Sequence, residues 1–127
     1  MAIHQEPQAD IERTTFGTTA EVTVGGELDI ASTPDFEHVI GDALRAGVER
    51  VIIDLCGATF IDSSAVNALL RLHRHATAQQ IDLIILRPHG EADRIFEICG
   101  IEGVFPKLDG SRKRSAGAGR DPGATAG

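Results

Sequence analysis

The sequence lacks tryptophan and tyrosine, and five phenylalanines supply its aromatic rings apart from histidine. Modules that bind nucleic acid by base stacking need aromatic platforms. The formal net charge of −7 also disfavours contact with phosphates, so direct nucleic-acid binding is not expected. No apolar run approaches the ~20 residues of a membrane span, and Met1 leads into a polar segment without a signal-peptide core. We expect a cytoplasmic protein that does not insert into a membrane.

Motifs for metals and cofactors are also lacking. Cys56 and Cys99 have no CxxC spacing, and we interpret them as reduced, half-buried small apolar residues. His73 and His75 are two residues apart on an expected helix, so they do not share a face and are poor metal partners. No phosphate-binding GxxxxGK[ST] motif is present. The sequence therefore predicts neither a cofactor nor a metal.

The length of 127 residues and a hydrophobic content of 42% indicate one globular domain with a single core. Residues 1–9 are expected to form a flexible lead-in, and residues 10–109 the domain. From Gly110 the apolar residues give way to Gly, Ala, Ser and basic residues, which predicts a disordered tail over 110–127. We interpret its basic cluster as solvated, with a tag for an acidic surface or nucleic acid as the alternative.

Apolar periodicity predicts an α/β fold with a mixed sheet of four to five strands and alternating helices. The order is strand–strand–helix–strand–helix–strand–helix, with a possible closing edge strand. Strands are expected at residues 14–16, 20–24, 51–54 and 81–86, helices at about 34–46, 63–77 and 91–99, and the closing strand at 104–108. The nearly uninterrupted apolar run at 81–86 predicts a strand in the interior of the sheet. Gly25 and Gly26 indicate a bulge or bend.

The stretch from Val51 to Leu72 is the most informative part of the chain. A buried strand begins at Val51, and Gly57 is expected to provide a turn after Asp54. Asp62, Ser63 and Ser64 are consecutive candidate caps for the helix that follows. The helix before this strand is expected to begin with a Ser or Thr cap at Ser32 or Thr33, just before Pro34.

Asp29 and the Asp62-Ser63 pair each follow a strand of the expected sheet. Strands joined through helices are parallel with right-handed crossovers, and sites on such sheets lie beyond the carboxyl ends of the strands. The topology therefore predicts that Asp29 lies near Asp62 and Ser63.

Residue types alone leave the role of Ser63 open. A hydrolase nucleophile would need the G-x-S-x-G elbow, whereas the local string is Ile61-Asp62-Ser63-Ser64-Ala65. No histidine has an independent claim to be a base, so an enzyme is disfavoured. On residue types alone, simple helix capping is the preferred interpretation of the three polar residues.

Several separated motifs resemble those of STAS domains, specifically of anti-sigma factor antagonists. The string from Thr59 to Val66, TFIDSSAV, is similar to the signature of that family. Gly26-Glu27-Leu28-Asp29 resembles its early motif, and the stretch from Gly100 to Pro106 resembles its last helix end and closing strand. The resemblance covers roughly residues 10 to 108. Where the family usually has Gly-Leu-Gly after the two serines, this chain has Ala65-Val66-Asn67.

The resemblance implies a single STAS-type domain and a regulatory protein, not an enzyme. The unphosphorylated form would bind an anti-sigma factor of the serine-kinase type and release the sigma factor. Phosphorylation of Ser63 would switch this binding off, and a phosphatase acting on Ser63 would restore it. Asp29, Asp62, Ser63 and Ser64 would form the partner-binding surface. The alternative is a non-switching regulatory or scaffold STAS subunit, either stressosome-like or transporter-associated.

Overall fold

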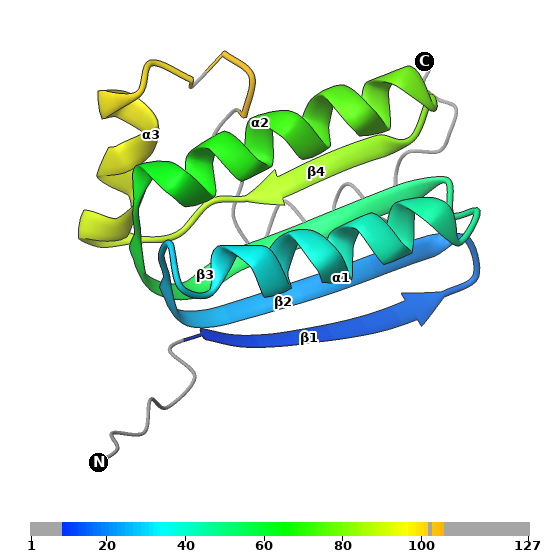
Figure 1. Ribbon diagram of the computed structural model, residues 1–127, viewed down its shortest axis with the longest axis horizontal. Coiled ribbons are helices and arrows are strands. Elements are labelled where there is room, and N and C mark those ends of the chain that lie inside the picture. The colour runs from blue at the N-terminus through cyan, green and yellow to red at the C-terminus, as the bar shows by residue number, and fades with distance from the viewer. Residues whose placement is uncertain (1–8, 102, 106–127) are drawn as a thin grey trace.

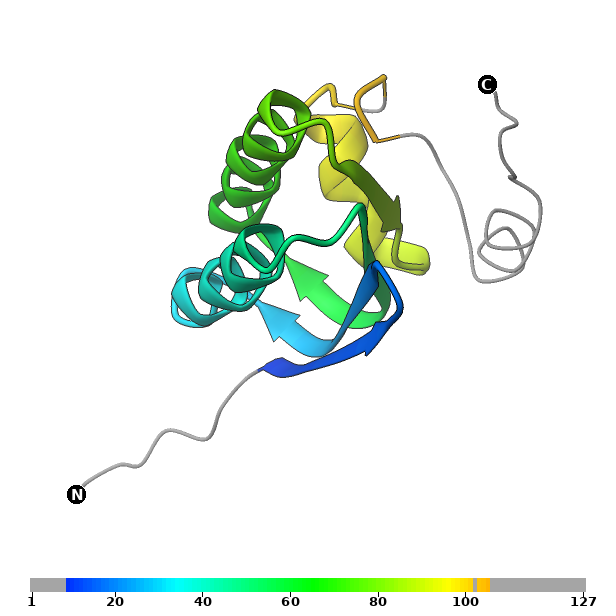
Figure 2. The ribbon, with the colours of Figure 1, turned by 90° about the vertical axis from the view of Figure 1, so that its right-hand side faces the viewer.

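Alternating apolar residues build a four-stranded mixed sheet, and two amphipathic helices cover one of its faces (Figures 1 and 2). This computed structural model describes residues 9–101 and 103–105. The elements are β1 (Ala9–Phe16), β2 (Thr19–Leu28), α1 (Thr33–Arg45), β3 (Arg50–Ile61), α2 (Ser63–Ala78), β4 (Asp82–Leu86), the 3-10 helix η1 (Gly90–Asp93) and α3 (Arg94–Ile98). The predicted fold class and element order are confirmed.

The first two strands form an antiparallel hairpin, and both are longer than the sequence predicts. β1 begins at Ala9, not Thr14, because it pairs with β2 along its whole length, from Ala9 opposite Gly26 to Phe16 opposite Thr19. β2 pairs with β3 in parallel, and this register shifts on both sides of the Gly25-Gly26 pair. The predicted irregularity is therefore present, although β2 continues beyond it.

The turn predicted at Gly57 is wrong. β3 continues through it from Arg50 to Ile61, because pairing with β2 outweighs the local preference for a turn. A Cβ atom at Gly57 would lie 3.4 Å from the carbonyl oxygen of Val24 and 3.5 Å from the Cα atom of Gly25. These are ordinary van der Waals distances, so β3 passes Val24 and Gly25 in regular packing at this position.

The interior position predicted for β4 is also wrong for the described residues. The strand order is β1-β2-β3-β4, so β4 pairs with β3 alone and lies at the edge. Its side chains are nevertheless covered, since Ile85 and Leu86 are buried. An apolar run reports burial of the faces of a strand, not hydrogen bonding along both of its edges. Val104 and Phe105 lie in a turn, not in the predicted closing strand, and residues 106–108 lie outside the described residues.

The core lies between the sheet and the pair α1–α2. Both helices carry an apolar stripe at helical spacing, as expected for elements covering a sheet. The buried residues include Phe36, Ile40 and Leu44 of α1, Val66, Leu69 and Leu72 of α2, and Val22, Val24, Ile53 and Leu55 of the sheet. No helix in the described part of the chain is long and apolar enough to cross a membrane.

The segment after β4 is held by a buried ion pair that the sequence did not indicate. The Arg87 guanidinium donates to Asp93 through Nε at 2.7 Å and Nη2 at 2.9 Å, and through Nη1 to the carbonyl oxygen of Phe105 at 3.2 Å. The same guanidinium lies 4.9 Å from the ring centroid of Phe96. The side chains of Arg87 and Asp93 are only 3% and 6% exposed. The pair therefore fixes η1 and α3 against the end of β4.

The predicted helix at 91–99 is divided into η1 and α3, and Gly100 ends it with a φ of 68°, as expected for a C-terminal glycine. Cys56 is half-buried, as predicted, and its thiol donates to the carbonyl oxygen of Arg87 at 3.6 Å. Cys99 is exposed, which corrects the expectation of partial burial. It follows Ile98 at the open end of α3, where nothing in the described core covers it.

Candidate functional site

The carboxyl ends of β2 and β3 bring two acidic loops together. Leu28 and Ile61 are paired in the sheet, and the Asp62 amide donates to the carbonyl oxygen of Leu28 at 3.2 Å. In the opposite direction, the Ile30 amide donates to Oδ2 of Asp62 at 3.2 Å. The loop that contains Asp29 therefore lies directly against the start of α2, where the topology placed it.

Asp62 is the N-cap of α2, and its carboxylate is occupied by structural hydrogen bonds. Oδ1 accepts from the amides of Ser64 at 3.0 Å and Ala65 at 3.2 Å, and from the Ser64 hydroxyl at 2.6 Å. Because Oδ2 takes the Ile30 amide, one carboxylate both starts α2 and ties it to the neighbouring loop. The capping interpretation is confirmed for Asp62, whatever further role the residue has.

Asp29 organises the turn between β2 and α1 in a similar way. Its Oδ1 accepts from the amides of Ala31 at 3.0 Å and Ser32 at 3.3 Å, the pattern of an Asx turn. Ser32 occupies the N-cap position of α1 but makes no side-chain cap bond, and its hydroxyl donates to the carbonyl oxygen of Glu27 at 3.0 Å. The predicted cap therefore lies at the right position but bonds backward, because its hydroxyl oxygen accepts from the Asp29 amide at 3.0 Å and not from an amide of the first turn.

Thr33 connects the two helix starts of the site, a role that the sequence analysis does not predict. It is buried, and its hydroxyl donates to the carbonyl oxygen of Asp29 at 2.7 Å and lies 3.5 Å from Oγ of Ser64. Thr33 thus links the start of α1 to the start of α2. A hydroxyl before a proline is typical of any helix start, so no signal in the sequence distinguished this one.

Ser63 differs from both of its neighbours. It is the first residue of α2 and is exposed, whereas Asp62 and Ser64 are half-buried. In the described part of the chain, no hydrogen bond ties up the Ser63 hydroxyl, while the Ser64 hydroxyl donates to Asp62. The structure thus separates two adjacent serines into one that holds the loop and one that is open to an approaching molecule.

The two departures from the family pattern also differ from each other. Ala65 is fully buried, so its methyl group belongs to the core and not to the surface around Ser63. Asn67 is exposed and lies one helical turn after Ser63, on the same face of α2. Only Asn67 changes what a molecule approaching Ser63 would meet.

An ion pair on the outer side holds the two helices in register. The Glu37 carboxylate accepts from Nε and Nη2 of Arg71, both at 3.0 Å. This hydrogen bonding, together with the charge of Glu37, raises the pKa of Arg71. Exposed pairs of this kind contribute little to stability. Its main effect is to fix the relative position of α1 and α2, whose first turns form the site.

The two carboxylates of this site are engaged in hydrogen bonds with backbone amides. Within the described ranges, no group of three or more His, Cys, Asp or Glu side chains could hold a metal ion. His73 is packed edge-on against Phe105, with ring centroids 5.6 Å apart, and His75 lies 2.8 Å from the Gln79 amide nitrogen. Both histidines lie at least ten residues after Ser63 in the sequence, and their contacts are with Phe105 and Gln79.

Comparison with known proteins gives the family of the chain. The family model described as STAS domain matches residues 10–113. The chain belongs to the STAS domain family. Two curated relatives of this STAS domain protein are the anti-sigma-B factor antagonists of Staphylococcus aureus (strain NCTC 8325 / PS 47) and Staphylococcus epidermidis. They are 28% and 26% identical over 102 residues, which is 80% of this chain and 94% of each relative. The predicted resemblance is confirmed.

Solved structures share the fold of this STAS domain protein. An anti-sigma factor antagonist from Mycobacterium paratuberculosis superposes with a TM-score of 0.76 at 19% identity, covering 90% of this chain and 97% of that one. The anti-sigma factor antagonist SpoIIAA in its unphosphorylated form gives a TM-score of 0.74 at 20% identity, over 89% of this chain and all of that one. Bacillus SpoIIAA in its phosphorylated form gives a TM-score of 0.65 at 20% identity, over 84% of this chain and 97% of that one.

Proposed function

We propose that this STAS domain protein is an anti-sigma factor antagonist that binds an anti-sigma factor of the serine-kinase type and is switched off by phosphorylation of Ser63. The curated relatives named as anti-sigma-B factor antagonists support the general function. SpoIIAA, a protein of the same fold, has been solved in phosphorylated and unphosphorylated forms. The observation that carries the proposal here is the exposed Ser63 hydroxyl between two engaged neighbours.

The fold tolerates a phosphate at this position. Phosphorylation adds about −1.5 to −2 charges at neutral pH. At the N-terminus of a helix such a charge is favourable by roughly 0.3–1 kcal/mol, and by up to ~2 kcal/mol in good geometry. Since Ser63 is exposed and its hydroxyl holds nothing in the described structure, the modification displaces no internal contact. The phosphorylated protein therefore stays folded.

The same phosphate opposes binding. A serine kinase brings nucleotide phosphates to the Ser63 hydroxyl, so a phosphoserine would face negative charge across the contact. Two unit charges of like sign about 4 Å apart cost ~4 kcal/mol at an effective dielectric constant of ~20. Each ~1.4 kcal/mol changes the affinity tenfold. The loss of binding therefore amounts to two or more decades, with little change in conformation, until a phosphatase removes the group.

Asp29, Asp62 and Ser64 have a supporting role in this proposal. Their hydrogen bonds fix the two loops on either side of Ser63, so that the kinase meets a rigid acceptor. Together with Ser63 they form the docking surface. A partner that aligns Ser63 for phosphoryl transfer must contact these loops, because reacting groups have to be held within a few ångströms of each other.

Incubation with ATP and the serine-kinase anti-sigma factor encoded in the same genome, followed by phosphopeptide mapping, tests this function. The expected product carries one phosphate, on Ser63, and no longer binds the kinase. A chain that binds no anti-sigma factor and acquires no phosphate would contradict the proposal. That result would favour the non-switching STAS subunit described above.

A further inference from the structure

We propose that the groove between the end of β3 and α3 receives an apolar side chain from a basic segment of the same partner that covers Ser63. The groove, hereafter the β3–α3 groove, has a volume of about 310 Å³ and is lined by Thr59, Phe60 and Ile61 of β3 and by residues of η1 and α3. The inference rests on the proposed function and deepens it, because it states what the partner presents beside its kinase site.

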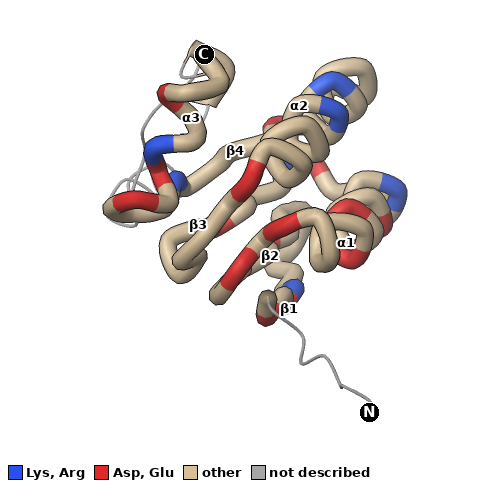
Figure 3. Tube along the Cα trace, turned by 60° about the vertical axis from the view of Figure 1, so that its left-hand side comes forward, with Lys and Arg blue, Asp and Glu red and all other residues tan. Residues whose placement is uncertain are grey.

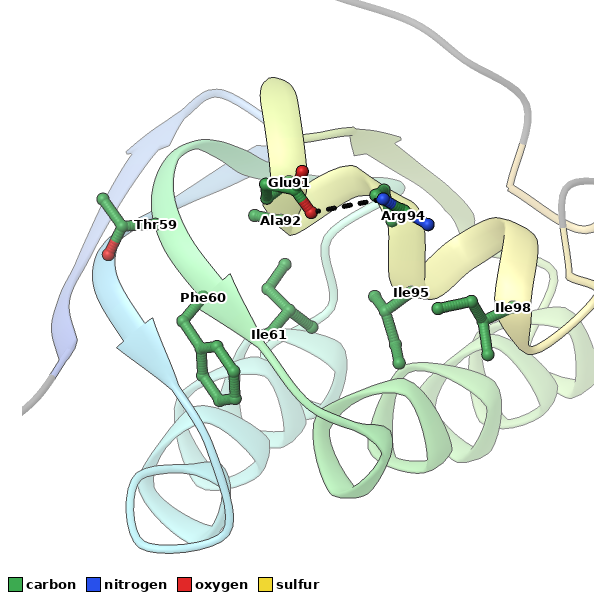
Figure 4. Close-up of a pocket in the computed structure, with 8 residues that line it drawn as sticks. All are labelled: Thr59, Phe60, Ile61, Glu91, Ala92, Arg94, Ile95 and Ile98. Atoms are coloured by element: carbon green, nitrogen blue, oxygen red, sulfur yellow. Dashed lines mark ion pairs between the residues drawn. The ribbon is translucent and has the colours of Figure 1, made fainter.

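The walls of the groove are apolar and open to solvent. Ile98 of α3 is 71% exposed and Phe60 of β3 is 48% exposed. Figure 4 shows Phe60 on one side of Ile61 and the side chains of Ile95 and Ile98 on the other. Single exposed apolar residues are ordinary on protein surfaces. Exposed apolar residues that gather around one groove are typical of a surface that another molecule covers.

The β3–α3 groove is continuous with the docking surface. Phe60 precedes Ser63 by three residues, so their Cα atoms are at most about 11 Å apart. A stable interface covers about 800 Å² on each partner, equivalent to a round patch of about 16 Å radius. A partner centred on Ser63 with a footprint of that size therefore reaches the groove. Figure 1 shows α3 beside the start of α2, at the edge where β3 ends.

Acidic residues adjoin the lining of the groove, which defines the partner further. Glu27 is paired with Phe60 in the sheet and is exposed, and Asp62 follows Ile61. Figure 3 shows acidic positions along the end of β2 and at the start of α2. The only basic side chain among the residues lining the groove is Arg94, which is paired with Glu91 at 3.6 Å. Electrostatic complementarity with these acids therefore favours a partner with basic residues around the apolar side chain.

The test compares exposed apolar residues at the two ends of the sheet. Ile98→Ser removes one wall of the groove, and Phe60→Ala removes the other. Phe16→Ser is the matched control, because Phe16 is 62% exposed and lies opposite Thr19, at the far end of β2 from Ser63. Affinity for the serine-kinase anti-sigma factor of the same genome is measured by isothermal titration calorimetry at low and high salt. Thermal melts verify that each variant is folded.

We expect Ile98→Ser and Phe60→Ala each to weaken binding about tenfold, equivalent to about 1.4 kcal/mol, and Phe16→Ser to stay within about twofold. Wild-type affinity should fall as salt rises. If both groove variants bind like wild type while Ser63→Asp does not bind, the groove proposal is wrong and the proposed function stands. If the wild-type chain does not bind the kinase, the proposed function fails and the groove proposal with it. A wild-type dimer that Ile98→Ser dissociates would assign the groove to a second copy and overturn the proposal.

Discussion

The Ser64 hydroxyl donates to Oδ1 of Asp62 at 2.6 Å, the shortest hydrogen bond of the site, whereas no such bond ties up the adjacent Ser63 hydroxyl in the described structure. This contrast assigns different roles to two serines that are chemically identical and adjacent in sequence. One holds the first turn of α2 to its N-cap, and the other lies at the surface of that turn.

Ser63, not Ser64, is the predicted phosphoacceptor. Ser63→Ala should abolish phosphorylation by the cognate kinase without changing stability, because its hydroxyl holds no internal contact in the described structure. Ser64→Ala should still be phosphorylated but should lose roughly 1 kcal/mol of unfolding free energy with the hydrogen bond to Asp62. Phosphopeptide mapping and urea denaturation of the two variants measure these effects. A phosphate found on Ser64 would overturn the assignment.

Asp62 is predicted to be a stabilising residue even without a partner. Asp62→Ala removes the acceptor for the amides of Ser64, Ala65 and Ile30. Loss of an N-cap costs about 0.5–2 kcal/mol, and 1 kcal/mol lowers the melting temperature of a domain of this size by roughly 4–8 °C. Asn67→Ala, an exposed change on the same helix, is the control and should leave the melting temperature nearly unchanged. Equal melting temperatures for the two variants would contradict this account of the loop.

The Arg87–Asp93 pair is predicted to be the most sensitive polar contact of the fold. Asp93→Ala leaves a buried guanidinium without its carboxylate, which typically costs 3–5 kcal/mol. Glu91→Ala is the control, because it breaks only the exposed pair with Arg94 and should cost less than about 1 kcal/mol. Urea denaturation followed by circular dichroism separates the two. The double variant Arg87→Met, Asp93→Leu should be more stable than Asp93→Ala alone, because it leaves no buried charge unpaired. A double variant no more stable than Asp93→Ala would contradict this account.

The features that sequence predicted are those set by local chemistry and topology. Asp62 and the serines after it mark a helix start because capping depends on a few consecutive residues. The proximity of Asp29 and Asp62 follows from the handedness of strand–helix–strand connections. Features set by distant contacts were missed or mistaken. β3 continues through Gly57 because β2 lies against it, and the partners of Arg87 come from η1, α3 and the segment after them.

The apolar run of β4 shows the same limit. Its composition correctly predicted that Ile85 and Leu86 are buried. Whether β4 is an interior or an edge strand depends on which strands pair with it, and hydropathy carries no information on that pairing. Ile98 is predicted as an ordinary member of a helix, whereas Phe60 lies beyond the strand predicted to end at Asp54. Their exposure around one groove became visible only when α3 was placed beside the end of β3.

The central claim is that charge on Ser63 controls binding without altering the fold, and two variants measured side by side test it. Ser63→Asp and Ser63→Ala are compared with wild type for affinity to the serine-kinase anti-sigma factor, for the circular-dichroism spectrum and for melting temperature. We predict that Ser63→Asp keeps the native spectrum and melting temperature yet loses binding, and that Ser63→Ala binds constitutively, even with ATP present. Binding of Ser63→Asp at wild-type affinity, or its unfolding, would contradict the account.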